Sequence, residues 1–329
     1  MKFLMIPGPR RRLPFYLAAE EFAARRLPAD DDYFFMWVVK PTVIVGRNQM
    51  IATEVNVDYC RVNDIDICRR KSGGGCVYAD LRNIMFSYIT ASGADTTATF
   101  AAYTEKVAAF LRTLGIDARA GSRNDVTVGD EGRKVSGNAF YRLGSRSIAH
   151  GTMLFSVDVE RMAAAITPST TKLLSKGVDS VRSRVTCVTL YRPDLSLDGF
   201  MDMARDYMTD GTLALDEAQI AEIEAIESPY YSDEWLYGQN PRGGAAFSKR
   251  IEGVGDFDVT ITTDSGRIEA IDLKGDFFLL ADLDSGLLDK LRGLPYDRAA
   301  VEAELEATQT DPSATIYGLT RRDLLDLLF

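Results

Sequence analysis

Apolar residues recur along this chain with two different periods. Intervals of three and four over residues 13–26 and 99–114 predict two amphipathic helices. Shorter runs rich in aromatic and β-branched residues predict strands. These strands are expected at 33–39, 42–45, 65–68, 84–90, 116–120, 126–128, 133–136, 139–143 and 147–157. Further helices are expected from the N-cap Thr53 to Asn63 and at 160–166, 170–174, 197–209 and 216–227. Because strands outnumber helices and several connections are short, we expect an α+β fold with a large mixed sheet.

The composition changes near residue 240. Residues 240–244, with the sequence Asn-Pro-Arg-Gly-Gly, are typical of a linker. We therefore expect two domains, 1–242 and 250–329. The second is expected to be a small α+β unit with strands at 255–263, 267–274 and 276–280 and helices at 282–292, 298–306 and 320–328.

Composition and charge narrow the class of protein. The chain has 329 residues, of which 46% are apolar and 26% charged, as in ordinary folded proteins. A formal net charge of −10 disfavours binding to nucleic acid or to an anionic membrane surface. There is no apolar run of about 18 residues, and the short apolar N-terminus is broken by Pro7. We expect a cytoplasmic protein and a monomer.

The cysteines give little sign of a disulfide framework or a zinc site. None of the four forms a CxxC pair, and the chain has one histidine. The cysteines, which we expect to be reduced thiols, are Cys60, Cys68, Cys76 and Cys187.

Residues 69–80 carry the sequence RRKSGGGCVYAD. Three consecutive glycines have no Cβ atoms, so their N–H groups can approach an anion closely. The preceding arginines are suited to bidentate contact with carboxylate or phosphate. The spacing matches neither of the two common phosphate-binding loops, and a tight turn with solvated charges is the alternative.

Three further boxes follow in order: SRNDVTV at 122–128, RKVSGNA at 133–139 and AHGTML at 149–154. With these boxes and the glycine run, the chain resembles the lipoate–protein ligase A family. The resemblance continues through 176–178, 180–186 and 235–238 and so covers nearly the whole chain. It implies a large ligase domain like those of biotin and lipoate ligases, followed by an accessory domain.

The resemblance also implies an activity. Such an enzyme uses ATP and Mg²⁺ to convert lipoate to lipoyl-AMP, and then transfers the lipoyl group to a protein lysine. The expected partners are lipoate and lipoyl-accepting domains, namely those of the glycine-cleavage H protein and of 2-oxoacid dehydrogenases.

Lys134 is the expected catalytic residue. Bringing a carboxylate and an α-phosphate together needs fixed positive charge between them, and Gly137 nearby would allow a ligand to approach. The resemblance implies that Lys134 contacts both the acid and the nucleotide. The expected ATP-binding residues are Arg70, Gly75, Cys76, Val77, Tyr78, Asn124, Asp125 and Lys134. The expected lipoate-binding residues are Ser72, Gly73, Gly74, Val77, Lys134, Gly137, Ala139, His150 and Gly151.

Several of these assignments have an alternative. Asp125 is expected to hold Mg²⁺ through water, but an Asx turn would use the same residue. His150 is either near the acyl pocket or a satisfied structural histidine. The apolar acyl slot has as its candidates Leu17, Trp37, Val77, Tyr78 and Ala139, each of which could equally be plain core.

The sequence departs from the family pattern at three positions. Ala79 and Ala149 replace histidines, and Cys76 stands where a small apolar residue is common. Cys76 beside two arginines suggests a transferase that forms a thioester without ATP. The missing histidines suggest a non-enzymatic lipoate-binding relative. A biotin ligase is disfavoured because no Gly-Arg-Gly-Arg loop is present.

Overall fold

The computed structural model describes residues 1–49, 51–91, 93, 95–121, 124–166, 184–237, 245–264 and 267–329. The helix predicted at 170–174 and the linker predicted at 240–244 lie outside these residues. Contacts divide the chain into two compact units. Unit 1 comprises Met1–Val45, Ile51–Arg70 and Cys76–Leu236, and unit 2 comprises Gly46–Met50, Lys71–Gly75 and Tyr237–Phe329.

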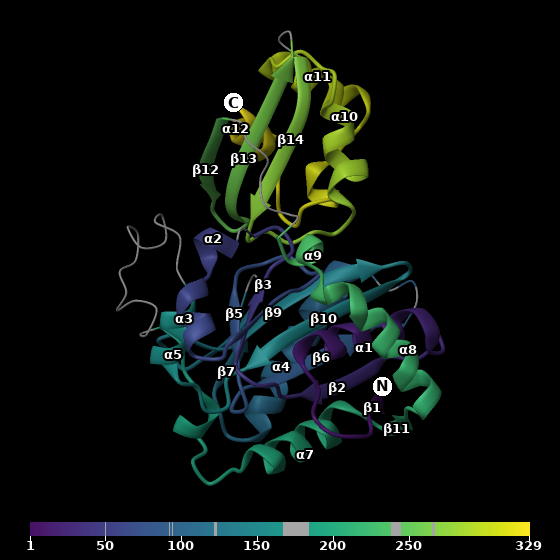
Figure 1. Ribbon diagram of the computed structural model, residues 1–329, viewed down its shortest axis with the longest axis vertical. Coiled ribbons are helices and arrows are strands. Elements are labelled where there is room, and N and C mark those ends of the chain that lie inside the picture. The colour runs from purple at the N-terminus through teal and green to yellow at the C-terminus, as the bar shows by residue number, and fades with distance from the viewer. Residues whose placement is uncertain are drawn as a thin grey trace. The chain divides into compact units, whose positions relative to one another are not determined.

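Unit 1 is built on an eight-stranded mixed sheet. Its strands are β1 (Lys2–Met5), β2 (Tyr33–Trp37), β6 (Ile84–Ile89), β7 (Ala118–Ala120), β8 (Asp125–Val128), β9 (Arg133–Leu143), β10 (Arg146–Met153) and β11 (Gly211–Ala214). They lie in the order β11-β1-β2-β6-β10-β9-β8-β7. Figure 1 labels all of these strands except β8. The pairs β11–β1 and β1–β2 are parallel, and the remaining pairs are antiparallel. A second sheet has three strands, in the order β4 (Asp66–Arg69), β3 (Thr42–Val45) and β5 (Val77–Ala79).

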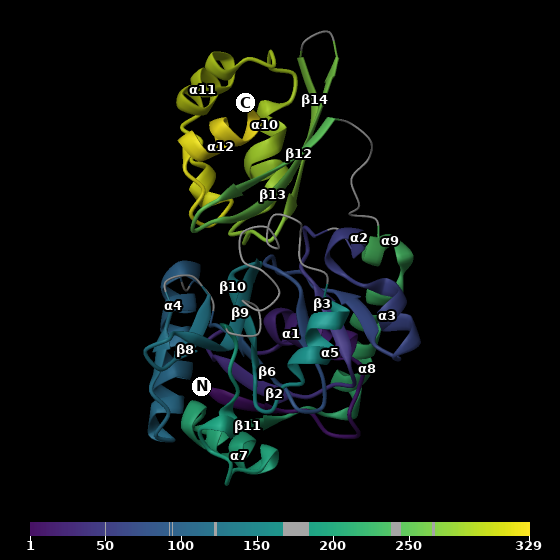
Figure 2. The same ribbon diagram turned by 90° about the vertical axis from the view of Figure 1, so that its left-hand side faces the viewer.

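Helices cover both faces of the large sheet. Among the described residues, the α-helices of unit 1 are α1 (Leu13–Arg26), α2 (Ile51–Glu54), α3 (Val57–Val62), α4 (Thr96–Thr113), α5 (Val159–Ala165), α7 (Leu197–Met208), α8 (Glu217–Glu227) and most of α9 (Asp233–Tyr237). Figure 2 shows α1 and α4 on opposite sides of the sheet, where α1 packs with α8 and α4 packs with α7. Among the described residues, no helix combines the length and apolar composition needed to span a bilayer.

The local sequence accounts for the two main helices. Pro14 lies in the first turn of α1, where its missing N–H costs nothing, and α1 matches the predicted range. Helix α4 begins three residues before the predicted start because the Asp95 side chain accepts a hydrogen bond from the Ala98 N–H. It ends before Gly115, whose φ of +79° suits a glycine.

Strand register decides which side chains face each helix. On one face, Phe35, Ser87, His150 and Ala139 lie opposite one another across β2, β6, β10 and β9. Since successive residues of a strand point to opposite faces, their neighbours lie on the other face. These neighbours are Phe34, Tyr88, Ala149 and Phe140. Tyr88 stacks on Tyr103, and Phe140 meets Phe100, both from α4.

Several predicted boundaries in unit 1 are wrong. Residues 133–143 form one strand, not two, and the predicted helix ending at Asn63 divides into α2 and α3. Asn56 caps α3, because its side chain accepts a hydrogen bond from the Tyr59 N–H. Strands β1, β5 and β11 were not predicted. They are only three or four residues long and depend on pairing with distant parts of the chain.

Unit 2 is centred on an antiparallel meander. It contains β12 (Ala245–Ile251), β13 (Gly255–Asp264) and β14 (Arg267–Gly275), with α10 (Asp289–Leu291), α11 (Arg298–Ala307) and α12 (Arg321–Leu328). Its apolar core joins the sheet to α11 and α12 through side chains such as Val259, Leu305 and Leu325.

The predictions for α11 and α12 are confirmed, and Thr320 forms a capping box for α12. β12 was missed, and residues 276–280 are not a strand. Leu279 forms an isolated bridge with Ile316 instead. The predicted helix 282–292 is a π-helical turn, Asp284–Leu288, followed by α10.

Candidate active site

An ion pair lies where β8 and β9 meet. The Lys134 Nζ is 2.7 Å from the Asp125 Oδ1, and each side chain is about a third exposed, at 36% and 37%. The Lys134 carbonyl also accepts a hydrogen bond from the Thr186 N–H at 2.8 Å. A fixed ammonium group is thus held at the partly exposed ends of β8 and β9, by a carboxylate with which an anionic ligand can compete.

An irregularity in the ladder places this pair. Asp125 pairs with Gly137 and Val126 with Ser136, but Thr127 pairs with Lys134, so Val135 is an extra residue in β9. The bulge brings Lys134 and Gly137 to the same face. A Cβ on Gly137 would lie only 2.5 Å from the Lys134 Cε and 2.6 Å from its Nζ. Gly137 is therefore required for the observed path of the lysine side chain.

Further along the same face lies a buried polar network. The His150 Nδ1 is 2.9 and 2.8 Å from the two carboxylate oxygens of Glu20 in α1. The Ser87 Oγ donates to the Glu20 Oε1 at 2.6 Å, and the Trp37 Nε1 donates to Ser87 at 2.9 Å. Glu20 and Ser87 are fully buried and His150 nearly so. His150 is thus buried with its Nδ1 bonded to Glu20, on the same sheet face as Lys134. This position is compatible both with a structural histidine and with a residue near the acyl pocket.

The two arginines before the glycine run are buried in unit 1. The Arg69 Nε donates to the Leu236 carbonyl, the Trp235 Nε1 donates to the Arg69 carbonyl, and burial lowers the pKa of Arg69 to about 10. The Arg70 Nη1 donates to the Ile44 carbonyl at 3.1 Å. Arg69 is therefore an internal anchor for α9, and Arg70 is held against β3.

Four predicted lipoate- or ATP-binding residues, Ser72 to Gly75, belong to unit 2. Ser72 is fully buried, and its carbonyl accepts from the Arg47 N–H. The Gly74 N–H donates to the Phe277 carbonyl at 3.0 Å, and Gly74 has a φ of +85°. A Cβ on Gly73 would lie 2.0 Å from the same carbonyl oxygen. The fold thus requires glycine at position 73 for lack of space and favours it at position 74 for its positive φ. A Cβ on Gly75 would make only ordinary contacts.

Strand β5 alternates between two apolar clusters. Val77 and Ala79 contact the cluster under α1, which contains Leu17 and Trp37, and Ala79 is fully buried there. Cys76 and Tyr78 contact the cluster formed around Val43 and Cys60. Of the acyl-slot candidates, Leu17, Trp37 and Val77 are therefore together, and Tyr78 is apart from them.

The surroundings of Tyr78, Ala79 and Ala149 bear on the predicted acyl pocket. The Tyr78 hydroxyl is buried with no hydrogen-bond partner among the described residues, and burial raises its pKa to about 12. Ala149 neighbours His150 in β10 and so lies on the opposite face from it, under α4. A histidine in place of Ala149 would therefore point away from the face that carries Lys134 and His150. Ala79 is fully buried in the same apolar cluster as Trp37, against which Val77 also packs.

The residues present can accommodate a magnesium ion only as part of a nucleotide complex. Among the described residues, no group of three or more His, Cys, Asp and Glu could hold a metal ion. Asp125 offers one accessible carboxylate, and Mg²⁺ is commonly bound by one or two carboxylates plus substrate phosphates. Asp125 therefore fits a magnesium ion that arrives with ATP.

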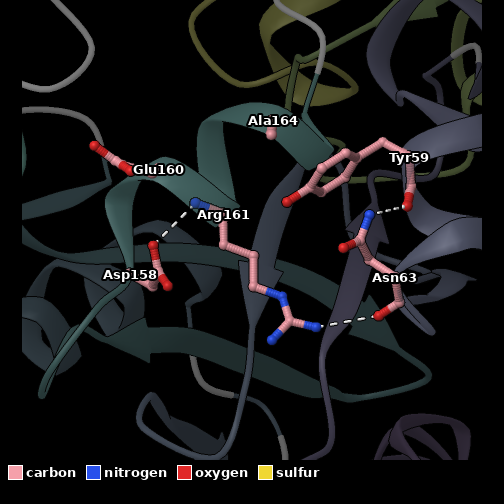
Figure 3. Close-up of a pocket in the computed structure, with 6 residues that line it drawn as sticks. All are labelled: Tyr59, Asn63, Asp158, Glu160, Arg161 and Ala164. Atoms are coloured by element: carbon pink, nitrogen blue, oxygen red, sulfur yellow. Dashed lines mark hydrogen bonds between the residues drawn. The ribbon is translucent and has the colours of Figure 1, made fainter.

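A pocket in another part of unit 1 is lined by α3 and α5 (Figure 3). Its residues are Tyr59, Asn63, Asp158, Glu160, Arg161 and Ala164. The Arg161 Nη2 donates to the Asn63 carbonyl, and the Arg161 N–H donates to the Asp158 carboxylate. This pocket contains none of the predicted site residues.

Comparison with known proteins finds a matching family for each of two parts of this chain. Residues 13–209 match the family described as lipoyl protein ligase A/B catalytic domain, and residues 240–328 match the bacterial lipoate protein ligase C-terminus. The chain belongs to the lipoate–protein ligase family. It is thus an enzyme of that family, with the expected ligase fold.

Individual relatives are similar over most of their length. The lipoate–protein ligase LplJ of Bacillus subtilis is 33% identical over 322 residues, which cover 95% of this chain and 96% of the relative. A bipartite lipoate protein ligase of Thermoplasma acidophilum, studied with its E2 lipoyl domain, has a TM-score of 0.65 and 27% identity, covering 74% and 98% of the two chains. A lipoate–protein ligase A bound with ATP has a TM-score of 0.63 and 26% identity, covering 72% and 99%.

Reasoning from the sequence missed two residues that shape this ligase site. Glu20 lies in a helix that reads as amphipathic, and no local signal indicates that its carboxylate is buried against His150. Asn138 lies in the RKVSGNA box but was not predicted as a site residue, although its side-chain amide donates a hydrogen bond to the Asn124 carbonyl. Both contacts join residues from separate elements, so neither is visible in the local pattern.

Proposed function

We propose that this protein is an ATP-dependent lipoate–protein ligase that works through lipoyl-AMP. A lipoate carboxylate oxygen attacks the α-phosphorus of ATP, and pyrophosphate leaves. The amine of an acceptor lysine then attacks the acyl carbon, AMP leaves, and the amine loses a proton. The names of the relatives support lipoate and ATP as substrates.

The observation that carries this proposal is the Lys134–Asp125 pair. Two anions repel each other as they approach, so a lysine between the carboxylate and the α-phosphate stabilises the negative charge that builds up. Among the described residues, Lys134 forms an ion pair with one partially exposed carboxylate, that of Asp125, at 2.7 Å. When the substrates bind, the ammonium group can exchange this partner for them. Asp125 would then be available to hold magnesium with the phosphates.

The other predicted residues are assigned around this pair. We propose Arg70, Gly75, Cys76, Val77, Tyr78 and Asn124 as ATP-binding residues, and Ser72, Gly73, Gly74, Val77, Gly137, Ala139, His150 and Gly151 as lipoate-binding residues. Gly151 lies opposite Asn138, on the other sheet face from His150, so its contribution would come from its main chain. The Tyr78 side chain is buried, so its contribution would come from its main chain. We also propose domain limits of 1–242 and 250–329.

The acceptor is proposed to be a lipoyl domain of a 2-oxoacid dehydrogenase or the glycine-cleavage H protein. The Thermoplasma acidophilum relative, studied with its E2 lipoyl domain, supports this class of partner. Net charge would not attract an acidic acceptor domain to this chain, because this chain is itself at −10.

The test measures the two half-reactions separately. The purified protein is incubated with lipoate and MgATP, and pyrophosphate release is followed. A lipoyl domain or H protein is then added, and its mass increase is measured. We expect pyrophosphate only when lipoate is present, followed by lipoylation. Transfer from an acyl-protein donor without ATP would instead identify a thioester transferase that uses Cys76. Lipoate binding without pyrophosphate release would identify a non-catalytic relative.

A further inference from the structure

Asn138 holds the residue immediately before Asp125. Its main-chain N–H donates to the Asn124 carbonyl at 2.9 Å, and its side-chain Nδ2 donates to the same oxygen at 3.0 Å. The Asn124 Nδ2 returns a hydrogen bond to the Asn138 carbonyl at 2.9 Å. Strand β8 begins only at Asp125, so these bonds extend the β8–β9 ladder by one residue, partly through side chains. We call these three bonds the Asn124–Asn138 clasp.

The Asn138 side chain cannot contact a ligand bound at Lys134. Gly137 lies on the Lys134 face, so its neighbour Asn138 points to the opposite face. There it is 3% exposed, and its Nδ2 also lies 3.2 Å from the Ser136 Oγ. Any effect of Asn138 on the reaction must therefore pass through the backbone of β8.

Gly151 makes room for this side chain. A Cβ at Gly151 would lie 2.0 Å from the Asn138 Oδ1 and 2.7 Å from its Cγ. Asn138 and Gly151 are directly opposite each other in the β9–β10 ladder. Because Gly151 has no Cβ, the Asn138 side-chain amide can reach the position at which it bonds to Asn124.

Along the ladder, the clasp lies just before Asp125, and the bulge lies between the positions of Asp125 and Lys134. Asp125 follows Asn124 directly, and Lys134 lies beyond the extra residue Val135. The end of a strand frays unless its backbone groups are paired, and the clasp supplies that pairing. A small shift of Asp125 would change where it holds the Lys134 ammonium.

We propose that Asn138 is a positioning residue for the Lys134–Asp125 pair. It fixes the start of β8 and thereby the direction from which Asp125 holds the catalytic lysine. The kinetic part of this inference rests on the proposed function, in which Lys134 acts in the first half-reaction.

The kinetic test uses Asn138→Ala, which removes the Nδ2 donor and leaves the main-chain bond. We expect the kcat for lipoate-dependent pyrophosphate release to fall about 10- to 100-fold, because misplacement by about 1 Å can cost 100-fold. The KM for the acceptor domain in the second half-reaction should be unchanged. The matched control is Thr90→Val, which removes a buried side-chain acceptor of the Ser147 N–H at the opposite end of the same sheet. This control should keep kcat within about twofold.

A double-mutant cycle separates positioning from general destabilisation. In an Asp125→Asn background, Asn138→Ala should lower kcat by less than about twofold further, since the two changes disturb the same contact. Independent, multiplying losses would overturn the proposal, as would an equal loss in Thr90→Val. Gly151→Ala gives a second approach, because it displaces the Asn138 amide without altering either asparagine. It should reproduce the loss in kcat.

A crystal structure of the Asn138→Ala variant tests the geometry without any activity. The separation of Lys134 Nζ and Asp125 Oδ1, which is 2.7 Å here, should increase beyond hydrogen-bond distance. An unchanged pair would refute the positioning role. If the wild-type protein releases no pyrophosphate with lipoate, the proposed function fails, and this measurement still decides the role of Asn138.

Discussion

The two faces of the eight-stranded sheet share every strand but carry different side chains. Under α4, aromatic pairs dominate, including Phe34 with Phe86 at 5.3 Å and Phe100 with Phe140 at 4.5 Å. Under α1, apolar packing is interrupted by a buried carboxylate, Glu20, with its histidine and serine partners. The exposed end of the same face carries the Lys134–Asp125 pair.

This difference separates stability from chemistry. Buried aromatic rings stabilise a fold without requiring a specific polar partner. A buried carboxylate is tolerated only when each oxygen is bonded, so its surroundings are tightly constrained. The α4 face can therefore be expected to tolerate apolar substitutions with little effect on catalysis, whereas changes on the α1 face should affect activity first.

The largest effect is expected from Lys134→Ala. Removing a preorganised positive group from a transition state typically costs about 100- to 1,000-fold in rate. Pyrophosphate release should fall by that factor, while the melting temperature changes by no more than about 2 °C, because the side chain is partly exposed. The control is Lys106→Ala on α4, whose ammonium group bonds to the Met208 carbonyl. Equal activity of the two variants would remove Lys134 from the mechanism.

Gly137→Ala should have the next largest effect. The new Cβ would meet the Lys134 Cε and Nζ at 2.5 and 2.6 Å, so the lysine side chain must move away from Asp125. We expect pyrophosphate release to fall about 10- to 100-fold. The matched control is Gly211→Ala in β11 of the same sheet, where a Cβ meets nothing within 4 Å. If both variants keep full activity, the observed path of Lys134 is not the one used in catalysis.

On the other face, Phe100→Leu should change stability and not kinetics. The loss of the ring pair with Phe140 and of some buried apolar surface should lower the free energy of unfolding by about 1 to 2 kcal/mol. Urea unfolding measures this loss, and steady-state assays of the native protein should give unchanged KM values for ATP and lipoate. A changed KM for lipoate would show that the two faces are coupled.

The smallest effect is expected at Cys76, which immediately precedes β5 of the three-stranded sheet. Burial raises the pKa of Cys60, and it raises that of Cys68 to about 12, so both thiols stay protonated at pH 8. Cys187 is buried, and Cys76 is partly exposed. Brief treatment of the native protein with iodoacetamide should therefore label Cys76 first, as read by peptide mass spectrometry. Cys76→Ala should keep activity within about twofold, and complete inactivity would favour the thioester mechanism.

Local patterns were sufficient for the helices that bury a continuous stripe. Helix α1 matches its predicted range, and α4 and α12 differ only at their caps. Short strands such as β1 and β11 were missed because four residues carry little periodicity, and each is stabilised by a partner about 200 residues away. The boundary between two predicted strands at 137–138 was wrong because Gly137 reads locally as a break, although its missing Cβ makes room for Lys134.

The sequence by itself determined the family to which this protein belongs. Its ordered boxes identified the family and pointed to Lys134 and Asp125, because a lysine and a carboxylate in those boxes are visible as residue types. Only the tertiary structure decided which groups act together. It placed Asp125 against Lys134 through a bulge, buried Glu20 against His150, and put Ala149 on the face away from both. Each of these results depends on strand register, which shifts whole sets of side chains between faces and is set by contacts between distant segments.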